Sequence, residues 1–234
     1  MAKTTYLKIV VSIYDKYFRK CYNDMLNRYG SFLNAVAYSD DVKAEVLLIG
    51  NHQARHNDLL SWRTEVCKAI NKLALAKPWT KNYASFCDIY KDVQFILRGC
   101  KYIGDLTIYD VALRLAALYP KYSLMPDKVY LNAGSLKAAK ELYKNGHLKK
   151  VTPIMDKIDF PTEFHVLRCD EIEDLLCFMQ HYGVFSSPIN LAKVKTPLGS
   201  CFRKNLLAYI LLETNWKKAV LPPSQLITLQ KRSK

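Results

Sequence analysis

Apolar residues recur three and four positions apart along most of the chain, which is the spacing of amphipathic α-helices. The clearest stripe consists of Leu59, Trp62, Val66, Ile70 and Leu73. The pattern predicts helices over residues 11–29, 31–38, 59–76, 84–98, 107–118, 135–145, 170–182 and 205–218. Only Glu45–Ile49 is equally compatible with a strand and a helix. We therefore expect an all-α protein.

Several predicted helices carry residues that are typical of helix ends. Gly99 follows the helix over 84–98, at a position where a C-cap glycine is common. Ser135 stands at the start of its predicted helix. Asp170 and Glu173 have the spacing of a capping box, so we expect a helix to begin at Asp170.

No internal repeat, low-complexity tract or Gly/Ser linker divides the sequence. The Pro-containing stretch Val151–Pro161 is the one candidate boundary. We expect a single all-α domain over residues 1–234, built either as one bundle or as two lobes with a cleft. The longest apolar run, Leu206–Leu212, is much shorter than the roughly 18 residues of a membrane span, and the N-terminus lacks the pattern of a signal peptide. These features predict a soluble, cytoplasmic protein that does not enter a membrane.

The charge is strongly unbalanced, with 35 Lys and Arg against 21 Asp and Glu, a net charge of +14 and a pI of about 9.4. Such a surplus attracts polyanions and favours phosphate contacts. The 16 tyrosines could add stacking faces for unpaired bases. The alternative is a basic protein with solvated lysines and a tyrosine-rich core. Charge alone does not choose between DNA, RNA and an anionic membrane surface.

The cysteines give no sign of a disulfide framework or a metal site. Seven of them are scattered along the chain, and no two stand at the C-x-x-C spacing that metal sites commonly use. We expect buried free thiols, no bound metal and no cofactor.

The segment Leu97–Thr107 links two predicted helices and is the most unusual local feature of the sequence. It contains Gly99 and Gly104, and Thr107 could cap the following helix. Such a turn exposes backbone N–H groups beside the positive end of a helix dipole, which suits a phosphate group. Plain helical bundles also contain turns of this kind.

Four segments of the sequence carry a resemblance to a known family. Ile103–Arg114 resembles the hairpin and second helix of the helix-hairpin-helix DNA-binding motif. Pro126–Gly134 is similar to the loop that follows this motif in helix-hairpin-helix DNA glycosylases. The flanks His52–Arg55 and Glu171–Cys177 resemble segments of uncharacterised bacterial proteins with the same architecture. The resemblance places the motif at about residues 84–118 and implies a glycosylase-like helical bundle.

The resemblance also implies the residues that contact DNA. They are Lys101, Tyr102, Ile103, Gly104, Asp105, Leu106 and Thr107 from the hairpin. Upstream, Gln53 and Arg55 form a polar cluster with His52 that could fill the gap left by a flipped base or bind the flanking phosphates, or could be an ordinary solvated loop. The family usually has glycine where this chain has Tyr102, and a tyrosine in a left-handed conformation would cost about 1 kcal/mol. We therefore expect a distorted hairpin. Bifunctional members have a Schiff-base lysine at the position of Leu106, so the chain resembles monofunctional ones.

Three residues are candidates for the catalytic group: Asp110, Asp127 and Asn132. Asp110 resembles an aspartate of the bacterial set, but Thr107 and Asp110 also have the spacing of a capping box. Asp127 follows a proline, where aspartate is also common in turns. Asn132 could orient a water molecule or simply be a turn residue.

We expect a monomeric, monofunctional DNA glycosylase that excises a modified or damaged base from double-stranded DNA. It would flip the base, hydrolyse the N-glycosidic bond and leave an abasic site, in repair or in antiviral defence against phage. The first alternative is a helix-hairpin-helix DNA-binding protein without catalysis. The second is a nuclease that binds a metal through Glu171, Glu173 and Asp174. The basic tail over residues 217–234 would contact phosphates in each case.

Overall fold

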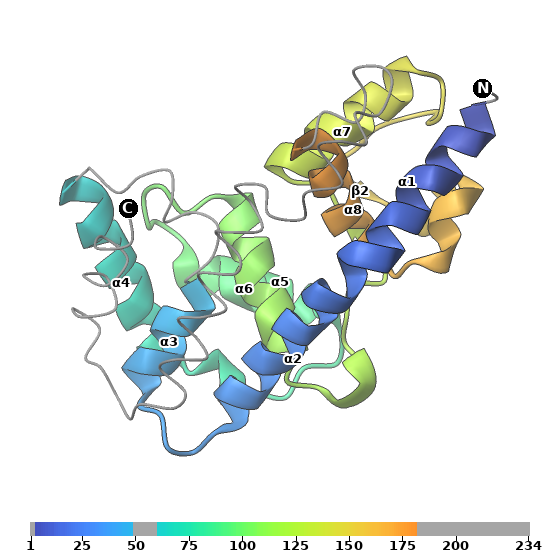
Figure 1. Ribbon diagram of the computed structural model, residues 1–234. Helices are drawn as coiled ribbons and strands as arrows, with labels where there is room; N and C mark the ends of the chain where they lie inside the picture. Colours follow the sequence, from blue (N-terminus) through green and yellow to red (C-terminus); the bar gives the residue numbers. More distant parts are fainter. Residues whose placement is uncertain (1–2, 49–59, 182–234) are drawn as a thin grey trace. The chain divides into compact units, whose positions relative to one another are not determined.

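The computed structural model describes residues 3–48 and 60–181, and these are mostly helical, as the apolar spacing predicts (Figure 1). The chain divides into two compact units. Unit 1 comprises residues 1–25 and 124–199, and unit 2 comprises residues 26–123 and 200–234. The predicted boundary segment Val151–Pro161 lies inside unit 1, so it does not separate the units.

The described helices are α1 (Lys3–Tyr17), α2 (Arg19–Asn34), α3 (Asp40–Leu48), α4 (Leu60–Ala76), α5 (Phe86–Leu97), α6 (Asp105–Ala116), α7 (Ala133–Lys144) and α8 (Cys169–His181). Short 3₁₀ turns are η2 (Pro78–Thr80), η3 (Pro120–Tyr122), η4 (Lys157–Asp159) and η5 (Thr162–Val166). Two short strands, β1 (Val129–Tyr130) and β2 (Ile154–Met155), form an antiparallel pair that the sequence pattern did not predict. The helix predicted over 205–218 lies outside the described residues.

The N-terminal helices differ from the prediction in where they divide. The break comes at Phe18, between α1 and α2, and Gly30 lies within α2. A Cβ at Gly30 would come within 2.3 Å of the carbonyl oxygen of Ala117, so glycine is required here for the close approach of two backbone segments. The ambiguous segment that begins at Glu45 is helical as far as Leu48.

Unit 1 has a core formed mainly by α7 and α8, with α1 beside them (Figure 1). The small side chains Ala138 and Ala139 lie on the buried face of α7 and allow α8 to pack closely. The largest fully buried side chains of this core include Tyr14 and Phe164. The β1–β2 pair adds Val129 and Met155 to the same core.

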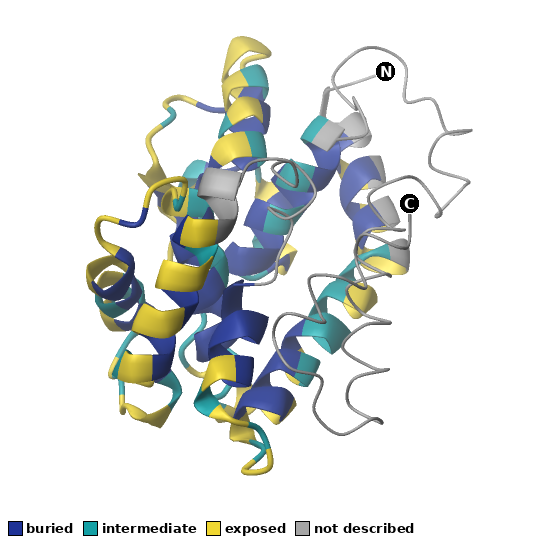
Figure 2. Cartoon of the chain, turned by 90° about the vertical axis from the view of Figure 1, so that its left-hand side faces the viewer, coloured by how far each residue is buried: buried dark blue, intermediate teal, exposed yellow. Residues whose placement is uncertain are grey.

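Unit 2 is organised around α6. Every residue from Val111 to Ala116 is buried, and α6 packs against α3 and α5. α3 is also buried, from Val42 to Leu48, whereas α4 and α5 bury one face and expose the opposite one. Figure 2 shows this mixture of buried and exposed positions along the helices. The side chain of Ser85 caps α5 by accepting a hydrogen bond from the backbone N–H of Asp88 at 3.2 Å. None of the helices in the described part of the chain has the length and apolar character needed to cross a membrane.

We predict that Gly30→Ala destabilises the protein by about 1 to 3 kcal/mol, because the new Cβ would overlap the carbonyl group of Ala117. Urea denaturation measures the change. Gly104→Ala is the matched control, because nothing lies within 4 Å of a Cβ built there. The control should cost only about 0.5 kcal/mol, from a poorer helix cap. Equal losses in the two variants would contradict the close approach at Gly30.

Candidate nucleic-acid interface

The chain between α5 and α6 forms a hairpin of tight turns. The backbone N–H of Arg98 donates to Phe95 at 3.3 Å, and that of Cys100 donates to Leu97 at 3.1 Å. Gly99 has a φ of +77° and Tyr102 has a φ of +65°. The tyrosine therefore adopts a left-handed conformation, at a cost of about 1 kcal/mol. The segment joins α5 to α6 through short hydrogen-bonded turns.

The start of α6 differs from the sequence prediction. Gly104 is the N-cap residue and Asp105 opens the helix, so the prediction that Thr107 caps it is wrong. Gly104 is extended, with φ −98° and ψ −179°, and no side chain caps the helix. Thr107 is the third helical residue, and its buried Oγ1 has no hydrogen-bond partner among the described residues.

The first turn of α6 therefore presents unused donors. The first backbone hydrogen bond of the helix runs from Ile108 to the carbonyl oxygen of Gly104 at 3.1 Å. Within the described part of the chain, the N–H groups of Asp105, Leu106 and Thr107 have no acceptor. These are the orphan donors of a helix N-terminus, where the helix dipole is positive. The geometry suits an anion.

Gly104 leaves this helix end uncovered. Its φ of −98° is accessible to any residue, and no atom lies within 4 Å of a Cβ built on it. Neither backbone conformation nor internal packing requires glycine here. The residue is exposed, so its missing side chain opens the backbone to a molecule outside the protein.

Contacts with α4 fix the hairpin in place. The Glu65 carboxylate accepts the backbone N–H of Lys101 at 2.8 Å and the Lys68 ammonium at 2.7 Å. The hydrogen bond from Lys68, together with that from Lys101, keeps the pKa of Glu65 below its ordinary value. The Lys72 ammonium donates to the carbonyl oxygen of Arg98 at 2.6 Å. The amide of Lys101 is thus used within the protein, while its side chain is exposed.

Asp110 lies farther along α6, as its sixth residue. Because the helix begins at Asp105, Asp110 does not form the capping box that its spacing from Thr107 suggested. The residue is half-buried, and burial raises its pKa to about 6 against the opposing charge of Arg114. Arg114 is itself buried, donates to the carbonyl oxygen of Leu47 and lies over the ring of Tyr29, 4.8 Å from its centroid.

The other two candidates for catalysis, Asp127 and Asn132, lie in unit 1. Asp127 is exposed in the turn before β1, and its carbonyl oxygen accepts a hydrogen bond from the thiol of Cys169 at 3.2 Å. Asn132 is the N-cap residue of α7, and its backbone N–H donates to the Ser135 hydroxyl at 2.9 Å. The helix thus begins at Ala133, not at Ser135 as predicted.

Glu45 is a residue that sequence reasoning missed. Its side chain on α3 is only 1% exposed, and neither carboxylate oxygen has a hydrogen-bond partner among the described residues. Burial raises its pKa to about 7. The available signal was an acidic residue between Ala44 and Val46 in an apolar segment that the pattern assigned only as strand or helix.

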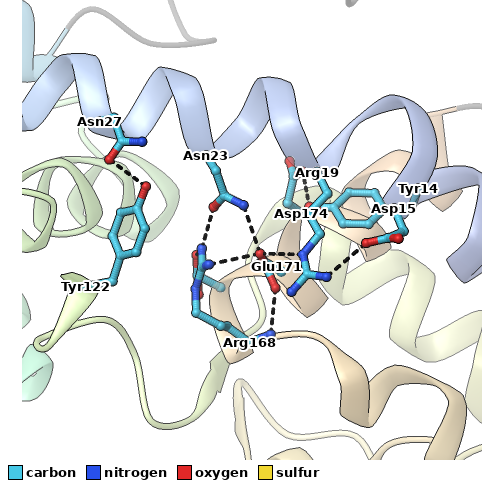
Figure 3. Close-up of polar contacts among 10 residues, drawn as sticks. Tyr14, Asp15, Arg19, Asn23, Asn27, Tyr122, Arg168, Glu171 and Asp174 are labelled. Atoms are coloured by element: carbon cyan, nitrogen blue, oxygen red, sulfur yellow. Dashed lines mark hydrogen bonds and ion pairs between the residues drawn. The ribbon is translucent and has the colours of Figure 1, made fainter.

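The acidic segment at the start of α8 forms a structural network. Figure 3 shows Arg19 and Asn23 donating to Glu171 at 2.8 and 3.1 Å, and Tyr14 donating to Asp174 at 2.8 Å. Glu171 also accepts the backbone N–H of Arg168 at 2.8 Å. Burial opposes the ionisation of Glu171, but its hydrogen bonds outweigh this effect and keep its pKa below the ordinary value.

The network shows that the predicted start of α8 is wrong by one residue, and it engages carboxylates that the nuclease alternative requires as metal ligands. The helix begins at Cys169, and Glu171, not Glu173, reaches back to its N-terminus. Glu173 accepts a hydrogen bond from the thiol of Cys177 at 3.4 Å. Within residues 3–48 and 60–181, no group of three His, Cys, Asp or Glu side chains could hold a metal ion. The carboxylates of this segment are engaged in protein contacts, which favours a structural role.

The predicted loop residues Gln53 and Arg55, with the neighbouring His52, lie outside the described residues, as does the basic tail. No family model matches the chain, and no curated protein or solved structure is similar enough to count as a match.

We predict that Glu45 makes the stability of the protein depend on pH. Its carboxyl ionises near pH 4.5 when unperturbed and near pH 7 in the folded protein. Between these values the unfolded chain has released a proton that the folded chain retains, so the free energy of unfolding falls as pH rises. Once both states are ionised, the loss should reach roughly 3 to 4 kcal/mol, at about 1.4 kcal/mol per pKa unit.

Urea unfolding at about pH 5 and about pH 8 tests this effect, because the two conditions bracket the titration. Glu45→Gln should remove most of the difference between them. Glu141→Gln is the matched control and should retain the difference, because the Glu141 side chain on α7 is 38% exposed. An undiminished pH dependence in Glu45→Gln would contradict the assignment.

Proposed function

We propose that the protein binds DNA through the α5–α6 hairpin and acts as a monofunctional DNA glycosylase of the helix-hairpin-helix type. The observation that carries the proposal is the N-terminus of α6, which is exposed at Gly104 and Asp105. There the N–H groups of Asp105, Leu106 and Thr107 have no acceptor among the described residues. The substrate is double-stranded DNA with a modified or damaged base, encountered in repair or in phage defence.

The hairpin supplies the groups needed to hold a phosphate. Three adjacent backbone amides and the helix dipole provide a favourable site for the oxygen atoms of one phosphate group. The bare backbone at Gly104 permits close approach. Exposed Arg98 and Lys101 flank this end of the helix and add mobile positive charge. Phosphate contacts of this kind position a protein on DNA without reading the sequence.

Asp110 is the best candidate for the catalytic carboxylate, because it is on the helix that begins at the hairpin. Base excision builds positive charge on the deoxyribose, which a carboxylate can stabilise while it orients a water molecule. Partial desolvation strengthens this electrostatic effect. Arg114 lies near enough to oppose the rise in the pKa of Asp110 and so favours its ionised form.

The alternative is a helix-hairpin-helix protein that binds DNA without catalysis. Asn132 is engaged at the start of α7 and Asp127 is exposed in a turn, and both observations weigh against these residues as catalytic groups. The choice between a glycosylase and a non-catalytic protein therefore depends on whether Asp110 is catalytic.

The first test measures DNA affinity as a function of salt. We predict that Lys101→Gln weakens binding to all duplex sequences and lowers the slope of log K against log salt by about 1. Asp105→Asn should strengthen binding, because it removes an exposed negative charge beside the phosphate. Lys121→Gln, beyond the opposite end of α6, is the matched control. Unchanged affinity and slope in both hairpin variants would overturn the DNA-binding proposal.

The second test separates glycosylase activity from binding and from metal-dependent cleavage. Duplex DNA with modified or damaged bases is incubated with the protein in EDTA and then treated with alkali. Strand breaks that require alkali indicate abasic sites, whereas breaks without alkali that disappear in EDTA indicate a nuclease. Binding without any product would support the non-catalytic alternative.

We predict that Asp110→Asn abolishes base excision and leaves DNA affinity largely unchanged, because the group acts on the sugar and not on the hairpin phosphate. The wild-type rate should fall as pH drops below about 6, where Asp110 becomes protonated. Circular dichroism establishes that the variant is folded. A folded and fully active Asp110→Asn protein would exclude this residue as the catalyst.

A further inference from the structure

Two aromatic rings stand exposed at the hairpin. Phe95, in the last turn of α5, is 74% exposed, and Tyr102 is 54% exposed. The buried face of α5 is formed by other residues, including Ile89, Val93 and Ile96. In the described residues, neither exposed ring contacts another aromatic ring. Core packing therefore does not account for either side chain.

Tyr102 is also held in an unfavourable backbone conformation. Its φ of +65° lies in the left-handed region, which glycine adopts without strain and which the neighbouring Gly99 adopts at +77°. A tyrosine at this position costs stability and leaves its ring in solvent. Strain of this kind in an exposed residue is consistent with a role for the side chain outside the fold.

Two cations lie between these rings along the chain. Arg98 and Lys101 lie between Phe95 and Tyr102 in sequence, and both are exposed. The segment is compact because each short turn closes with a hydrogen bond, from Arg98 to Phe95 at 3.3 Å and from Ile103 to Cys100 at 3.4 Å. Lys72 joins the group from α4 through its hydrogen bond to the carbonyl oxygen of Arg98. We call Phe95, Arg98, Lys101, Tyr102 and Lys72 together the hairpin surface.

We propose that the hairpin surface binds DNA at unpaired bases, with the rings stacking on bases and the cations contacting the adjoining phosphates. This inference rests on the DNA binding proposed above and narrows its partner to DNA that contains a single-stranded or unstacked segment. Exposed aromatics interleaved with cations are the combination that single-stranded nucleic acids require. The bases of a regular duplex are stacked on one another and offer such rings little surface.

The test compares the binding of three fluorescent DNAs: a single strand of about 20 nucleotides, the matching duplex, and that duplex with a central unpaired loop. Wild-type protein should bind the single strand and the looped duplex more tightly than the regular duplex. Phe95→Ala should reduce this preference about tenfold while leaving regular-duplex affinity unchanged, and Tyr102→Gly should reduce the preference by a similar factor. Tyr102→Phe should retain it, because stacking needs the ring and not the hydroxyl.

Urea unfolding of the variants tests whether a loss of binding is caused by a loss of stability. Tyr102→Gly should unfold at an equal or higher urea concentration than wild type, because it relieves the left-handed strain. Tyr143→Ala removes another exposed tyrosine, 52% exposed on α7, and should change neither binding nor preference.

The outcomes separate the two proposals. If Lys101→Gln weakens all three DNAs and the ring variants keep the preference, the protein binds DNA but the stacking inference is wrong. A wild-type preference for regular duplex over the single strand would also overturn it. If wild-type protein binds none of the three DNAs, the proposed function itself fails.

Discussion

The burial of α6 is the constraint on which unit 2 depends. From Val111 to Ala116 every residue is enclosed by neighbouring helices, and a buried Arg114 ties the helix to the carbonyl group of Leu47. The first turn of the same helix is left without a capping side chain. A helix whose body is fixed can present its N-terminal amides to solvent, since the packing of the body compensates for donors that have no internal partner.

In unit 1, hydrogen bonds and ion pairs of charged side chains stabilise a helix N-terminus, that of α8. The start of α8 is enclosed by Arg19, Asn23 and Arg168, whose hydrogen bonds satisfy the carboxylate of Glu171 (Figure 3). Burying a charged carboxylate is costly unless it is paired and hydrogen-bonded, and here it is both. An acidic segment within a strongly basic chain thus has a structural explanation that its composition alone did not reveal.

Sequence periodicity predicted the long helices well, since α4, α5 and α8 lie within a few residues of the expected ranges. It placed helix starts poorly. Thr107 and Ser135 have the side chains of cap residues, yet the caps are Gly104 and Asn132. The third helix, α8, begins at Cys169, one residue before Asp170. Side-chain type identifies residues that are able to cap, whereas the backbone conformation of the preceding segment decides which one does.

The remaining differences also have physical causes. The strands β1 and β2 have two residues each, too few to produce an alternating pattern. Gly30 reads as a helix break, but its role depends on the distant carbonyl group of Ala117. Of the candidate site, the turn between the two helices and the place of Asp110 on the second helix were accessible from the sequence, whereas the burial of Asp110 was not. The burial of the Glu45 carboxylate without a hydrogen-bond partner among the described residues was not accessible from the sequence, because it depends on which residues surround the side chain.

The tie between the hairpin and α4 has a consequence for recognition. Glu65 accepts the amide of Lys101 and Lys72 donates to the carbonyl oxygen of Arg98, so both arms of the turn are anchored before a ligand arrives. Association with a flexible loop must offset the conformational entropy lost on ordering, whereas a preorganised turn avoids most of that cost. The hairpin should therefore engage its partner as a rigid template, with little change of shape in the bound complex.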